Sequence, residues 1–87
     1  MSWTCRLSKD AAKQLRRLPK DRQRQIAKAI DEMEEDPLKG DVRPIKGGRF
    51  KGALRKRVGR YRIIFSLESS ERVVEIAAIL TRTERTY

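Results

Sequence analysis

The chain has 87 residues, with 22 Lys or Arg against 12 Asp or Glu and a formal net charge of +10. This length allows one domain with a small core, and 38% hydrophobic residues fit a folded chain. No apolar run is long enough to span a membrane, and no signal-peptide pattern opens the chain. The single cysteine excludes an internal disulfide and favours a cytoplasmic location. With no histidine, a Cys/His metal site is nearly excluded.

The positive charge is concentrated in the C-terminal part of the chain. Residues 1–36 carry nine positive and seven negative charges, whereas residues 37–87 carry thirteen and five. Such clustering favours an anionic target, namely nucleic acid, a ribosome surface or an acidic protein partner. A basic domain with no anionic target is the alternative.

The first element predicted is a short strand. Trp3, Cys5 and Leu7 alternate with polar residues, so one face of this strand is expected to be buried. Cys5 is then a small core residue, because the chain has no histidine that could activate its thiol as a nucleophile.

Two helices are predicted next, as a hairpin. Ser8 is a suitable N-cap for a helix from Lys9, and Pro19 ends this helix and begins a second one that runs to about Asp36. Both helices carry an apolar stripe that must pack on a sheet. The acidic run 31–36 at the end of the second helix opposes the helix dipole, and we expect the basic block to compensate through structural ion pairs.

Residues 38–52 read as a connector with several turns. A short edge strand is expected over 42–45, weakened by Pro44. Glycines mark the turns that follow, and three cations lie on them: Lys46, Arg49 and Lys51. The GxxxxGK[ST] pattern of a phosphate-binding P-loop is absent.

The segment 54–65 is the most informative stretch. It predicts two strands joined at Gly59, with Arg55 and Arg57 on one face and Lys56 between them. After the glycine, Arg62 falls on the face opposite to the one shared by the aromatic residues. From residue 43 to residue 62 the chain has nine Lys or Arg and no acid. A block of one sign on strands suggests a site built for an anion.

The last strand is predicted from Arg72 to about Thr81. The expected faces are, on one side, Val74, Ile76, Ala78 and Leu80 and, on the other, Val73, Ala77 and Ile79. Apolar residues on both faces indicate a central strand. The fold class predicted is α+β, a helical hairpin packed on a small, mostly antiparallel sheet, in the order β-α-α-β-β-β with room for one extra short strand.

Four features in this order resemble the RelE family of toxins, within the RelE/ParE superfamily. They are the short first strand, the helical hairpin with Leu-Pro at its corner and Asp-Pro at its end, a basic strand pair and a closing pair of residues. The basic strand pair reads Arg55-x-Arg57-Val58-Gly59-x-Tyr61-Arg62-Ile63-Ile64, and the closing pair is Arg82-x-x-x-x-Tyr87. The resemblance covers nearly the whole chain and implies a single RelE-like toxin domain over 1–87.

The resemblance implies a ribosome-dependent mRNA endoribonuclease (an mRNA interferase) that needs neither metal nor cofactor. It implies cleavage of A-site mRNA by 2′-hydroxyl attack, and neutralisation by a cognate antitoxin that is acidic, RelB-like and partly disordered when free. The catalytic positions carried over are Arg57, Arg62, Arg82 and Tyr87. The RNA-binding positions are Lys46, Lys51, Arg55, Lys56, Arg60 and Arg85.

The general base is open between Tyr87, which is favoured, and a lysine. An arginine stays protonated and cannot serve as the base without strong perturbation. Two residues depart from the family pattern, because Lys56 replaces an apolar residue and Arg60 replaces an acidic or small one. Two other functions remain: a ParE-like inhibitor of DNA gyrase, and a non-catalytic RNA- or ribosome-binding module.

Overall fold

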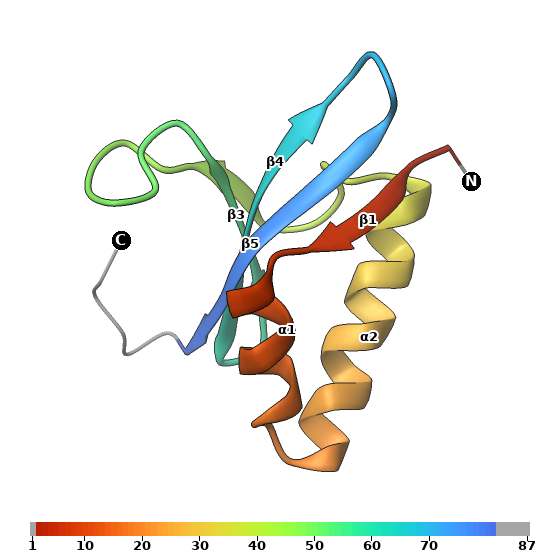
Figure 1. Cartoon of the computed structure of the whole chain (residues 1–87), viewed down its shortest axis with the longest axis vertical. Coiled ribbons are helices and arrows are strands. Elements are labelled where there is room, and N and C mark those ends of the chain that lie inside the picture. Colours follow the sequence, from red (N-terminus) through yellow and green to blue (C-terminus); the bar gives the residue numbers. More distant parts are fainter. Residues whose placement is uncertain (1, 82–87) are drawn as a thin grey trace.

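The protein, seen here as a computed structural model that describes residues 2–81, places two helices on one face of a sheet (Figure 1). The elements are β1 (Thr4–Leu7), α1 (Lys9–Arg16), α2 (Lys20–Glu35), β2 (Val42–Pro44), β3 (Leu54–Val58), β4 (Tyr61–Glu68) and β5 (Val73–Thr81). Within this range the strands form one sheet in the order β1-β5-β4-β3-β2. β1 runs parallel to β5, and the other pairs are antiparallel. This confirms the predicted α+β class, and β2 is the extra short strand.

The helical hairpin forms as its sequence predicts. The Ser8 hydroxyl accepts a hydrogen bond from the Ala11 amide and so caps α1, and Pro19 stands at the N-cap of α2. The inner side of α2 is buried through Ile26, Ala29 and Met33. These residues share one core with the helix-facing side chains of the sheet, among them Tyr61, Ile63, Phe65, Val74 and Ile76. Neither described helix is both long enough and apolar enough to cross a membrane.

The second face of the sheet has its own smaller core. Ile45 is buried there, and Phe50 and Ala53 pack against the same cluster, so the segment 45–53 covers part of this face. The strand residues beneath it are Ile64, Ala78 and Leu80. Arg62 lies two residues from Ile64 on β4, so its side chain falls on the same face of the sheet.

The predicted alternation of β5 is wrong beyond Ile76. Ile64 pairs with Ala78 but Phe65 pairs with Ile76, so Ala77 is an extra residue in the ladder. A bulge of this kind shifts the side-chain alternation by one residue. Ile79 therefore joins the core under the helices, and Ala78 moves to the second face.

The end of α2 packs along the outer edge of β1. The backbone carbonyl of Glu34 accepts hydrogen bonds from the amides of Ser2 and Trp3, and its carboxylate accepts one from the Cys5 amide at 3.3 Å. Glu34, one of the acids in residues 31–36, therefore accepts hydrogen bonds from backbone amides at the edge of the sheet. The sequence had instead led us to expect these acids to pair with the basic block. Cys5 packs against the core as predicted. Burial, with Glu34 and Asp31 nearby, raises the pKa of its thiol to about 11.

Candidate functional site

Arginines from adjacent strands meet on the face of the sheet away from the helices. Val58 pairs with Tyr61 across a two-residue turn. Gly59 has a φ of +59°, as the first position of a type II′ hairpin turn requires. This register sets Arg57 directly opposite Arg62. The predicted hairpin and its join at Gly59 are confirmed.

We call the arginines on this face, namely Arg43, Arg55, Arg57 and Arg62, the cationic face. The ladder places Arg43 opposite Arg55 on β2 and β3, and the Arg57–Arg62 pair lies two residues further along β3. Arg57 is exposed, and Arg55 and Arg62 are half-buried against the sheet. Four guanidinium groups held on three neighbouring strands can each offer planar, paired N–H donors to phosphate oxygens.

Sequence analysis missed an acidic residue in this group. Asp41 directly precedes β2, and its carboxylate lies 3.5 Å from Arg55 Nη1, 3.6 Å from Arg43 Nε and 3.7 Å from Arg57 Nε. The segment predicted to carry only positive charge therefore has a carboxylate among its arginines in the folded protein. The only signal was that Asp41 precedes the first residue of that block by two positions.

The other described cations of the predicted set lie in turns. Lys46, Arg49 and Lys51 are exposed on the segment that crosses the second face, and Arg60 is exposed in the hairpin turn. Arg49 stacks over the ring of Phe50, with its guanidinium carbon 5.1 Å from the ring centroid. It also lies 4.0 Å from the Asp10 carboxylate. This contact with an acid therefore joins Arg49 to α1 and not to the cationic face.

Lys56 does not lie on the cationic face. Its side chain points to the helix side of the sheet, where only 6% of the residue is exposed. The ammonium group donates a hydrogen bond to the Lys39 carbonyl at 2.7 Å. A cation enclosed in this way holds the segment between α2 and β2, and its position gives no support to the predicted contact with RNA.

Three predicted positions, Arg82, Arg85 and Tyr87, lie outside the described residues. The arrangement of the catalytic set therefore rests on Arg57 and Arg62. Within residues 2–81 no group of three or more His, Cys, Asp or Glu side chains is placed to hold a metal ion.

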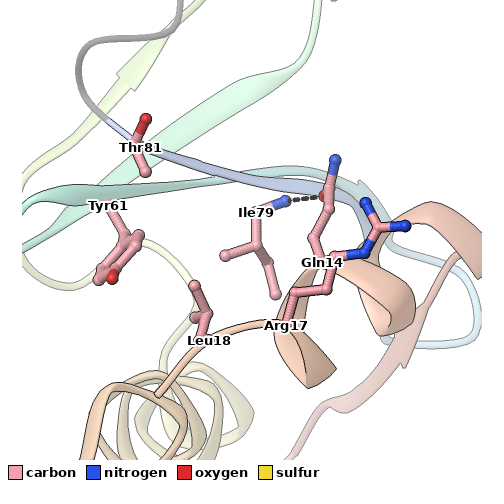
Figure 2. Close-up of a pocket in the computed structure, with 6 residues that line it drawn as sticks. All are labelled: Gln14, Arg17, Leu18, Tyr61, Ile79 and Thr81. Atoms are coloured by element: carbon pink, nitrogen blue, oxygen red, sulfur yellow. Dashed lines mark hydrogen bonds between the residues drawn. The ribbon is translucent and has the colours of Figure 1, made fainter.

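A pocket of about 270 Å³ lies on the helix side, beside the first residue of β4 and the last residues of β5 (Figure 2). Leu18, Tyr61 and Ile79 give it an apolar lining, and the Gln14 side chain accepts a hydrogen bond from the Ile79 amide at 2.7 Å. β1 ends before this part of β5, so Gln14 takes the place of a strand partner. The pocket does not include the arginines of the cationic face.

Comparison with family models identifies the family, and comparison with solved structures supports the fold. The model of the family described as "ParE toxin of type II toxin-antitoxin system, parDE" matches residues 5–86. In the archaeal RelE–RelB complex from Pyrococcus horikoshii, a chain with 28% identity superposes with a TM-score of 0.80, covering 98% of this chain and 100% of that one. In the RelB–RelE complex from Methanococcus jannaschii, a chain with 26% identity superposes with a TM-score of 0.67, covering 87% of this chain and 88% of that one.

The isolated RelE toxin from Escherichia coli has the same fold. It has 20% identity and a TM-score of 0.72, covering 98% of this chain and 88% of that one. Comparison with curated proteins gives no match. Because the family model spans nearly all of the sequence, this chain belongs to the ParE toxin family of type II toxin–antitoxin systems, within the RelE/ParE superfamily.

Proposed function

We propose that this toxin is a ribosome-dependent endoribonuclease that cleaves mRNA in the ribosomal A site and so stops translation. The observation that supports this most is the direct opposition of Arg57 and Arg62 on adjacent strands. Like charges directly opposite each other destabilise a sheet. A phosphodiester bound between them would remove that repulsion, which makes the pair suited to an anionic substrate.

The proposed reaction is an in-line attack of the 2′-hydroxyl on the adjacent phosphate. The bond from the 2′ oxygen to phosphorus forms and the bond to the 5′ oxygen breaks, which gives a 2′,3′-cyclic phosphate and a 5′-hydroxyl. The enzyme must take a proton from the attacking oxygen, stabilise the phosphate charge and give a proton to the leaving oxygen. Arg57 and Arg62 stabilise the phosphate, and Arg82 completes this group.

Tyr87 is proposed as the base or its assistant, with an arginine opposite it as the acid. The pKa of a free tyrosine is about 10, and guanidinium groups placed beside it would favour the ionised form that accepts a proton. The ribosome supplies orientation of the substrate, which can contribute several kcal/mol to the rate. The exposed cations Lys46, Lys51 and Arg60, with the half-buried Arg55 and with Arg85, bind the RNA backbone.

The proposed partner in the cytoplasm is an acidic, RelB-like antitoxin that is partly disordered when free. The complexes from Pyrococcus horikoshii and Methanococcus jannaschii are complexes of RelE with RelB. The net charge of +10 suits an acidic segment that folds on binding and covers the cationic face.

Cleavage on programmed ribosomes tests this proposal. The 3′ and 5′ ends of the products are mapped for wild type, Arg62→Ala and Tyr87→Phe, with naked RNA as a parallel substrate. Arg24→Ala is the matched control, because Arg24 is an exposed arginine on α2, away from the cationic face. We expect 2′,3′-cyclic ends in the A-site codon on ribosomes only, with losses of about 100-fold or more in Arg62→Ala and no loss in the control.

Two outcomes would change the assignment. If Tyr87→Phe cleaves as wild type does, the base is another residue and a lysine is the next candidate. If folded wild-type protein binds ribosomes but does not cleave, the toxin is a non-catalytic ribosome-binding module.

A second candidate is inhibition of DNA gyrase, which the ParE description of the matching family model favours. A supercoiling assay distinguishes inhibition of gyrase from cleavage of mRNA. Inhibition of gyrase by the free toxin, with no cleavage of mRNA on ribosomes, would replace the endoribonuclease proposal.

A further inference from the structure

We infer that Asp41 is a positioning residue of the cationic face, whose carboxylate holds Arg43, Arg55 and Arg57 in the free toxin and competes with RNA phosphates for them. The part concerning RNA rests on the proposed function. The part concerning the arginines rests on the geometry alone.

The geometry of the three contacts allows another anion to replace the Asp41 carboxylate. The N···O distances of 3.5, 3.6 and 3.7 Å are longer than the 2.7–2.9 Å of tight charge-assisted hydrogen bonds. The Asp41 side chain is 40% exposed, so another anion can approach the same guanidinium groups. Arg55 is the most enclosed partner, with 16% of its side chain exposed. A phosphate oxygen that reaches Arg55 or Arg57 must therefore displace the carboxylate or share the guanidinium groups with it.

The backbone around Asp41 is fixed by β3. The Arg57 amide donates a hydrogen bond to the Asp41 carbonyl at 3.0 Å. The buried ammonium of Lys56 binds the Lys39 carbonyl at 2.7 Å, one residue before Gly40. Gly40 has a φ of +89°, and a Cβ there would lie 2.9 Å from Lys56 Nζ. The position of the carboxylate thus follows from a constrained turn.

Two opposite effects on catalysis follow from this arrangement. Removing the carboxylate removes a competitor, so RNA should bind more tightly. Removing it also frees three guanidinium groups of like charge from a common partner, so they are no longer held in place before the reaction. Preorganised donors are what lowers the barrier in phosphoryl transfer. Asp41→Asn should therefore lower both KM and kcat.

The test compares Asp41→Asn with Glu71→Gln. Glu71 is exposed in the turn between β4 and β5, at the opposite end of β4 from Gly59, and its substitution changes the net charge by the same amount. On programmed ribosomes we expect Asp41→Asn to lower KM by about threefold or more and kcat by about tenfold relative to Glu71→Gln.

Two further measurements need no catalysis. The first is the NMR signals of the arginine Nε–H groups in the free protein. Those of Arg43 and Arg57, whose Nε atoms face Asp41, should shift in Asp41→Asn and stay in place in Glu71→Gln. The second is the affinity for a 2′-O-methyl RNA oligonucleotide, which lacks the attacking hydroxyl and should bind more tightly to Asp41→Asn than to the control.

The outcomes separate this inference from the proposed function. If wild type does not cleave mRNA but the NMR shifts and the oligonucleotide affinity follow the expectation, the endoribonuclease proposal fails and the role of Asp41 stands. Unchanged arginine signals, or an oligonucleotide affinity equal to that of Glu71→Gln, would overturn the role of Asp41. Asp41→Ser gives the same comparison if Asp41→Asn does not fold.

Discussion

Two substitutions of Lys56 should distinguish what its aliphatic stem and its ammonium group each contribute to stability. Only 6% of the residue is exposed, so the aliphatic stem is buried while the ammonium binds the Lys39 carbonyl. Lys56→Ala removes three buried methylene groups at about 0.8 kcal/mol each, and the cavity left behind adds to the loss. We expect a decrease of about 3 kcal/mol in the free energy of unfolding.

Lys56→Met keeps an unbranched apolar side chain and removes only the charge. The lost hydrogen bond from a charged donor is worth about 1.5–3 kcal/mol. Relief from burying an ammonium is worth several kcal/mol, so the two effects nearly cancel. We expect Lys56→Met to lie within about 1 kcal/mol of wild type, or to be more stable.

Urea denaturation followed by circular dichroism gives both values, provided the m-values agree. At this chain length, Lys56→Ala should lower Tm by roughly 12–24 °C. A methionine variant as unstable as the alanine variant would refute the reasoning, because stability would then come from the ammonium and not from the stem.

Two further predictions concern the hairpin and the thiol. Gly59→Ala should cost about 1–2 kcal/mol in denaturation experiments because φ is +59° there, and Gly59→Asn should cost less since asparagine tolerates this region; equal stability of all three proteins would argue against the left-handed turn. The pKa of the Cys5 thiol is raised to about 11 in the folded protein. The contribution of the protonated thiol to the free energy of unfolding is therefore complete below the pKa of the unfolded state and is lost as pH rises toward 11. Thiol-reagent kinetics should show much slower modification of the native than of the unfolded protein near pH 8; equal rates would contradict the assigned pKa.

The pattern of neighbouring residues in the sequence was sufficient to predict most of the fold. It failed where the structure depends on how distant strands pair. The hairpin at Gly59 follows from residues adjacent in the chain, and so does the helix corner at Pro19. The bulge at Ala77 does not, because it depends on how β4 and β5 align across the sheet. A run of apolar residues on both faces hides such a shift, since either register places hydrophobic side chains in a core.

The candidate site shows the same division. Alternation placed Arg55 and Arg57 on one face of their strand, and Arg62 on the side of its strand opposite to the aromatic residues. Only the register that pairs Arg57 with Arg62 shows that these two faces are the same one. Alternation could not reveal that Asp41 turns back onto them, because that contact is made by β2 pairing with β3 across an intervening loop. The burial of Lys56 was equally hidden, since a lysine in a basic block gives no sign that its stem is enclosed.

The parallel pairing of β1 with β5 also bears on synthesis of the toxin. Thr4 pairs with Val73 and Leu7 with Ile76, so the first strand made has no partner until the last described strand follows it. β5 also lies between β1 and β4, so β1 can join the sheet only through β5. Contacts this distant in sequence form late in folding. A nascent chain arrested before β5 would therefore leave β1 unpaired and would lack the core residues that β5 supplies, although β2, β3 and β4, which carry the cationic face, would already have been made.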